Sequence, residues 1–137
     1  RSKDIQRIFQ YHGAEHMAVH CFESKKDLTT KNCRDFSTIH PRCGTSFIFI
    51  VLLVSIFTFS IVWSEKLYIN ILLRITFIPV IASLSYEILK FASKKQNNLL
   101  IRLISFPGLL IQKITTKQPD DSQLEVAIAA VKSATSQ

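Results

Sequence analysis

Glycine and cysteine are scarce in this 137-residue chain, with three residues of each, and their scarcity excludes several classes of protein. The sequence contains no glycine-rich phosphate-binding loop and no Gly-x-Ser-x-Gly nucleophile motif. Its odd set of cysteines, Cys21, Cys33 and Cys43, cannot all pair, which argues against a small disulfide-bonded secreted protein. We expect reduced thiols or metal-bound thiolates on the reducing side of a membrane.

Acidic residues are also few, ten against 17 Lys and Arg, which gives a net charge of +7 although 47% of the residues are hydrophobic. The apolar residues lie in blocks, and the charges lie between them. We expect four regions: a polar metal-site segment (1–46), a transmembrane hairpin (47–89), a basic interfacial segment (90–118), and a C-terminal helix and tail (119–137). Because the chain begins with Arg1, we expect it to be part of a longer or processed protein.

Two apolar stretches, 47–63 and 67–89, decide the expected fold class. The first has 17 residues without a charge, and a helix needs about 17–25 residues to cross the hydrocarbon core of a bilayer. Trp63 suits the membrane interface. The second stretch carries Arg74, which we expect to face a protein partner or a water-filled groove. The sequence predicts an all-α membrane protein with a transmembrane helical hairpin. The alternative is a pair of buried helices in a soluble domain, which would rarely lack a polar face over such a length.

The basic residues orient this hairpin. Eight Lys and Arg precede residue 47, seven follow residue 89, and the connecting loop has Lys66 alone. By the positive-inside rule, both ends are expected on the cytoplasmic side or its organellar equivalent. No basic stripe with interleaved aromatic residues occurs, so we expect anionic lipid and not nucleic acid as the partner of these charges.

The last two regions predict peripheral elements. Residues 99–111 are too short to cross a bilayer, and Pro107-Gly108 is expected to break a helix there, which favours an interfacial or re-entrant segment. The region after residue 118 begins with three residues that can cap a helix: Asp120, Asp121 and Ser122. Three apolar residues then share a helix face, which predicts an amphipathic docking helix: Leu124, Ile128 and Val131.

The candidate chemistry begins with His12, Glu15 and His16, which have the spacing His-x-x-Glu-His on a predicted N-terminal helix. Residues four apart share a helix face, so both imidazoles can bind one ion. Glu15 can then take a proton from water as a general base, as in metallopeptidases with this motif. The alternative is a pair of ordinary surface histidines, and Gly13 does not favour a helix.

A second cluster, His40 and Cys43, lies directly before the first apolar stretch. Imidazole and thiolate together suit Zn²⁺. Four ligands are therefore expected, or three with an open position for water: His12, His16, His40 and Cys43. Glu87 ends the second stretch on the same side of the hairpin, where it can be a further ligand, or a partner of Arg42 or of a ligand's second nitrogen. The alternative is that its side chain simply reaches water. His20 and Cys21 could be ligands only through a further rotation around the same helix, so we expect them to pack or to support the ligands. We expect Cys33, which stands alone among charged residues, to be an ordinary thiol.

The order of these motifs resembles the DUF1385 family of bacterial and plastid-related membrane proteins. Four stretches carry the resemblance: RIFQYHGAEHMAVHCFE, HPRCGTSFIFIV, RITFIPVIASLSYEILK and FPGLLIQKITTKQPDDSQLEVAIAA. The resemblance implies the C-terminal part of a multi-pass protein of a bacterial inner membrane or plastid membrane, described as a metal-dependent enzyme. Family motif positions coincide with these residues: His12, Glu15, His16, His40, Cys43, Tyr86 and Glu87. Met17 departs from the family pattern, and we expect it to alter the surface.

Two functions are compatible with these features. The first is a membrane-embedded, zinc-dependent hydrolase that acts on peptides, or else on lipids, with Glu15 as general base. The second is a non-catalytic subunit or assembly factor whose fully coordinated metal staples the polar segment to the hairpin. We favour the hydrolase because a structural metal site does not need Glu15. The expected partners are the lipid bilayer and either other membrane subunits or an upstream part of the same protein.

Overall fold

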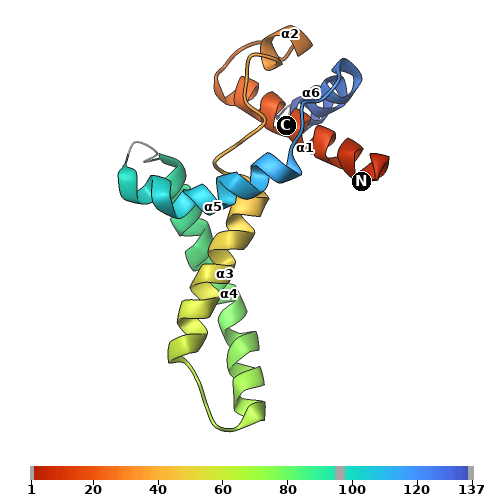
Figure 1. The fold of residues 1–137 in the computed structure, drawn as a ribbon. Coiled ribbons are helices and arrows are strands. Elements are labelled where there is room, and N and C mark those ends of the chain that lie inside the picture. The colour runs from red at the N-terminus through yellow and green to blue at the C-terminus, as the bar shows by residue number, and fades with distance from the viewer. Residues whose placement is uncertain (1, 95–97, 136–137) are drawn as a thin grey trace. The chain divides into compact units, whose positions relative to one another are not determined.

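A computed structural model describes residues 2–94 and 98–135, so that Arg1 and Lys95, two of the basic residues counted above, lie outside the described part. The described residues form helices and no strand, which confirms an all-α fold (Figure 1). The helices are α1 (Lys3–Glu23), α2 (Thr30–Cys33), α3 (Gly44–Ile61), α4 (Leu67–Lys94), α5 (Leu99–Thr115) and α6 (Asp121–Thr135). The chain divides into two compact units, Arg1–His40 with Leu109–Gln137, and Pro41–Gly108.

The core of the first unit lies where α1 packs against α2 and α6. Small residues on α1, Ala14 and Ala18, allow the close approach, and Met17 and Leu124 fill the space between the helices. Met17 is 1% exposed, so the expectation that it alters the surface was wrong. Its position three residues after Ala14 and one before Ala18 places it on the buried face of α1.

Two cysteines belong to the same core. Cys21 and Cys33 are both fully buried and unpaired by a disulfide, and the Cys21 thiol donates a hydrogen bond to the Asp27 carbonyl at 3.5 Å. Burial, followed by the neighbouring Cys21 thiol, raises the pKa of Cys33 to about 12. Cys33 is therefore a packed core residue that stays protonated, and the prediction that it stands alone among charged residues was wrong.

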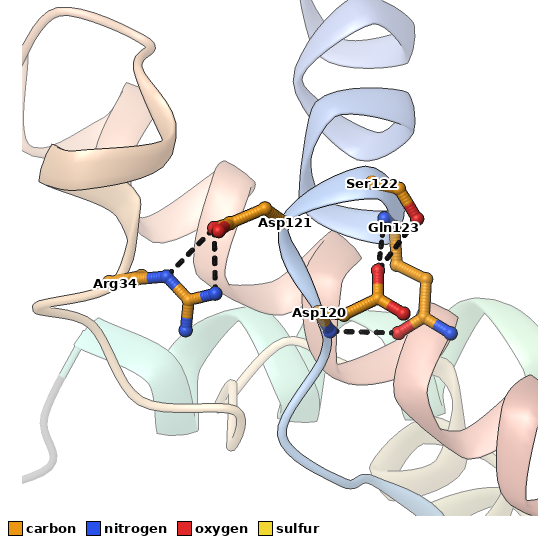
Figure 2. A network of polar contacts seen from close by, with 5 residues as sticks. All are labelled: Arg34, Asp120, Asp121, Ser122 and Gln123. Carbon is orange, nitrogen blue, oxygen red and sulfur yellow. Dashed lines mark hydrogen bonds and ion pairs between the residues drawn. The ribbon is translucent and has the colours of Figure 1, made fainter.

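The start of α6 is fixed by a reciprocal pair of hydrogen bonds (Figure 2). The Asp120 carboxylate accepts from the Gln123 backbone N–H at 2.9 Å, and the Gln123 side chain accepts from the Asp120 N–H at 3.0 Å. The Gln123 N–H lowers the pKa of Asp120. Among the three predicted caps, Asp120 is the residue that caps the helix. Beside it, Arg34 pairs with Asp121 at 2.6 Å and ties the end of α2 to α6.

The second unit contains α3 and α4, which lie side by side as a hairpin (Figure 1). The Asn70 side chain closes the turn, with bonds of 2.8 and 2.7 Å to the backbone of Ser64. Both helices are long and apolar enough to cross a membrane, and only 11% and 6% of their most apolar windows are buried. They are therefore not buried core helices in the described part of the chain. Arg74 is exposed and lies over the Phe59 ring, 5.7 Å from its centroid.

The structure corrects the prediction that Pro107-Gly108 breaks a helix, because α5 runs through both residues. Proline removes one backbone donor, whereas the rest of the helix keeps its bonds. Gly108 lies against the first turn of α3, where an added Cβ would come within 2.8 Å of the Ser46 hydroxyl oxygen. This glycine therefore serves a close helix contact and not a turn. The interfacial or re-entrant position of the segment stays a prediction.

Candidate metal centre

One face of α1 carries a row of metal-ligand side chains. His12, His16 and His20 follow one another at intervals of four residues, and Glu23 comes three residues later. At about 100° per residue these four positions fall within about 80° of the helix circumference. His40 meets this row from the segment after α2. His20 was expected to have a packing or supporting role, and Glu23 was not among the predicted site residues, although the continued spacing along α1 was a signal for both.

The four imidazoles form a continuous cluster within the first unit. The ring centroids of His12 and His16 lie 4.4 Å apart, those of His16 and His40 5.8 Å, and those of His40 and His20 4.4 Å. The structure thus brings together three of the predicted ligands, His12, His16 and His40. The His40 ring lies nearer to His20 than to His16. The cluster therefore has two halves, His12 with His16 and His20 with His40.

Backbone carbonyls fix the orientation of three of these rings. The contacts join His12 Nδ1 to Thr115 O at 3.0 Å, His16 Nδ1 to Thr38 O at 2.6 Å, and His20 Nε2 to Ile39 O at 2.9 Å. Because a carbonyl oxygen only accepts, each of these nitrogens carries the proton. The lone pair of the neutral ring is then on Nε2 of His12 and His16. Metal-binding histidines are typically oriented by a second-nitrogen bond of this kind.

Gln112 holds His40 in place. Its side-chain oxygen accepts from the His40 backbone N–H at 2.8 Å, and its side-chain nitrogen donates to the His40 carbonyl at 2.9 Å. Gln112 is fully buried, and a buried amide needs such partners. Gln112 was not among the predicted site residues. Its signal was a lone amide in an otherwise apolar stretch of α5.

Gly13, like Gly108, lies in close contact with another segment of the chain, which its low helix propensity did not predict. The backbone N–H of Lys117 donates to the Phe9 carbonyl at 2.9 Å, and a Cβ on Gly13 would lie 2.1 Å from the Lys117 carbonyl oxygen. Gly13 lies inside α1 in spite of its low helix propensity. Only glycine at this position permits the Lys117 backbone to come so close to the helix. The same approach places the Thr115 carbonyl against His12.

The other predicted site residues are Glu15, Cys43 and Glu87. Glu15 is exposed on α1. Cys43 and Glu87 belong to the second unit: Cys43 caps α3, with its sulfur accepting from the Thr45 N–H at 3.4 Å, and Glu87 is exposed and pairs with Lys90 at 3.6 Å. A role for Glu15, Cys43 or Glu87 at the metal stays a prediction.

Burial of the cluster predicts a pH dependence of stability. Burial lowers the pKa of His16 and of His40 from the ordinary value of 6.5, and at His40 the neighbouring His20 adds to the effect. Just below pH 6.5 the unfolded chain therefore binds more protons than the folded chain. The contribution of the two neutral imidazoles to stability is fully present above about pH 6.5 and is lost as the pH falls below that value. We expect the thermal midpoint of the metal-free protein to fall from pH 7.5 to pH 5. A His16→Gln, His40→Gln variant should show a much smaller fall, and an equal fall would contradict the assignment.

Comparisons with known proteins agree with this set of motifs. The family model described as "Protein of unknown function (DUF1385)" matches residues 1–137. The "Uncharacterized protein YqhQ" of Bacillus subtilis (strain 168) is 40% identical over 124 residues, which are 90% of this chain and 39% of that protein. This chain thus spans about two fifths of its relative, and no solved structure matches it. The match over the whole length shows that the chain belongs to the DUF1385 family.

Proposed function

We propose that this chain is the metal-binding part of a membrane-embedded, zinc-dependent hydrolase with a peptidase-like activity. The observation that carries the proposal is the paired orientation of His12 and His16. Both rings donate their Nδ1–H to a backbone carbonyl, and both lone pairs are on Nε2, one helical turn apart. Two such imidazoles on one helix are the usual start of a catalytic zinc site.

The proposed ligand set is His12, His16 and Cys43, with Zn²⁺ as the ion. Cys43 follows His40 by three residues, so their Cα atoms can be at most about 11 Å apart. Imidazole and thiolate ligands favour zinc over magnesium or calcium. Three protein ligands would leave one position for substrate or water, and zinc there would lower the pKa of water and polarise a carbonyl group.

Glu15 is the proposed general base of this site. It lies about 60° around α1 from His12, at about 100° per residue, and its charge acts on His16. It is exposed, so its carboxylate can exchange protons with solvent. A purely structural metal would have no use for a carboxylate here, which favours the hydrolase.

The membrane position is part of the proposal. The apolar side chains of α3 and α4 are largely exposed within the described chain, and so large an apolar surface needs lipid or a partner to cover it. We propose that α3 and α4 span the membrane, with both ends of the chain on the cytoplasmic or stromal side, as the basic residues favour. Arg74 would then face another subunit or an upstream part of the same protein.

The second candidate is the non-catalytic metal staple. It is favoured by the hydrogen bonds that already tie residues 38–40 to α1 and to Gln112. In this case the protein would be a subunit or assembly factor of a larger membrane complex, and its metal would be structural, without any turnover.

One experiment separates the two candidates. We expect the purified chain in lipid nanodiscs to bind zinc and to cleave members of a peptide mixture, as read by mass spectrometry, and we expect chelation to stop the cleavage. The His12→Ala, His16→Ala variant should lose both this activity and the catalytic zinc. Bound zinc without cleavage would support the staple, and unchanged zinc in the double variant would contradict both candidates.

A further inference from the structure

The far half of the histidine row forms a second cluster of ligand atoms. His20 and Glu23 come from the last turns of α1, and His40 faces them from the segment after α2. We propose that these three residues form a second divalent metal site, with a donor set suited to Zn²⁺, that is distinct from the His12–His16 site. The inference does not depend on the hydrolase, because all three residues lie within the first unit.

The distances fit a zinc site. One ligand atom from each of the three residues lies within 4.8 Å of the others. His40 Nε2 and Glu23 Oε2 are 3.3 Å apart. Two ligands that each bind a tetrahedral zinc at about 2.0–2.1 Å are separated by about 3.3 Å, so this pair needs little movement to share an ion. His20 must approach by up to about 1.5 Å, which a side-chain adjustment at the end of a helix can supply.

Neighbouring groups hold two of the ligands in place. The His20 Nε2–H donates to the Ile39 carbonyl, which leaves the lone pair on Nδ1, and the ring stacks on Phe36 at an interplanar angle of 8°. The backbone of His40 is bonded on both sides by Gln112. Rings fixed in this way lose little entropy when they bind an ion.

The burial pattern gives the site an entrance. The His40 side chain is 6% exposed, whereas that of Glu23 is 34% exposed. An ion can therefore enter past Glu23 and reach the buried imidazoles. Two imidazoles and one carboxylate form a donor set that proteins use for zinc. In this position the ion would fasten the segment before His40 to the end of α1.

The competing explanation is a hydrogen bond or ion pair between His40 and Glu23 without any metal. That contact is 3.3 Å long, which is longer than the usual range of about 2.7–2.9 Å for a strong charge-assisted bond. It also gives no role to the lone pair of His20. A count of bound ions distinguishes the two explanations.

The test is the stoichiometry of zinc on the full chain. The protein is stripped with a chelator, dialysed against Zn²⁺ and measured by mass spectrometry of the metal. We expect two ions per chain, one ion in a Glu23→Gln variant and one in a His20→Ala variant. Glu125→Gln, an exposed glutamate on α6, is the matched control and should keep both ions.

Co²⁺ substitution and hydrogen exchange are further readouts that distinguish loss of the second site from misfolding of the variants. Co²⁺ in the wild type should show bands from two sites, and Glu23→Gln should lose one set. Zinc should slow amide exchange at residues 36–40 in the wild type and not in Glu23→Gln. One ion in the wild type, with the same count in both variants, would overturn the second site. One ion in the wild type and none in either variant would mean that only the His12–His16 ion is missing. That result would overturn the proposed function and leave this inference standing.

Discussion

A Gly13→Ala substitution is expected to destabilise the first unit by about 3 kcal/mol or more, the upper end of the cost of overpacking. The new Cβ would lie 2.1 Å from the Lys117 carbonyl oxygen, which is backbone and cannot rotate away. The chain at Lys117 must therefore retreat from α1, and its bond to the Phe9 carbonyl must weaken. Chemical denaturation of the purified chain, followed by hydrogen exchange in α1 and α6, measures the loss.

Gly44 provides the matched control. It also lies in a helix, at the first position of α3, and an added Cβ there would meet nothing within 4 Å. Alanine is a better helix former than glycine, so Gly44→Ala should leave the stability unchanged or raise it by about 0.5–1 kcal/mol. Equal effects at the two positions would show that the Lys117 contact does not determine the need for Gly13.

A Glu15→Gln substitution is expected to reduce peptide cleavage by about 10²–10⁴-fold, the usual contribution of a general base. The amide has nearly the shape of the carboxylate but cannot accept a proton at neutral pH. Because Glu15 is exposed and is not a proposed ligand, the variant should keep its zinc and its thermal midpoint. Cleavage rates and metal content on the same preparation measure both expectations.

Glu125→Gln serves as the control for the loss of one exposed negative charge. It should retain the full cleavage rate. A Glu15→Gln variant that cleaves as fast as the wild type would remove the argument for the hydrolase. The metal staple would then be the better account of the histidine row.

Local sequence signals predicted much of the fold. The spacing of His12 and His16 anticipated a helical face, and α1 runs through both residues. Asp120 was among the three expected caps of α6. The two apolar stretches correspond to α3 and α4. These features depend on neighbours a few residues apart in the chain, so a sequence pattern can reveal them.

Contacts between distant segments could not be predicted in this way. Gly13 and Gly108 were interpreted as helix-unfavourable, whereas each permits a backbone or side chain from another element to come close. Met17 and Cys33 were expected outside the core, because nothing in the local pattern shows that α1, α2 and α6 pack together. Such tertiary contacts override local preference.

The candidate site was predicted in its first half only. His12, His16 and His40 were identified and lie in one cluster. His20 was set aside as a packing or supporting residue and Glu23 was not considered, because the prediction relied on a five-residue motif, although the helix continues the same face for two further turns. Gln112 is 72 residues from His40 in the chain, and no local signal connects the two.

The most direct test of the proposed hydrolase centre is X-ray absorption spectroscopy of zinc in the Glu23→Gln variant, which is expected to retain only the His12–His16 ion. The account predicts two imidazole nitrogens at about 2.0–2.1 Å, one sulfur at about 2.3 Å from Cys43, and one lighter ligand. The sulfur signal should disappear in a Cys43→Ser background. A zinc shell without imidazole, or a variant that binds no zinc, would contradict the account.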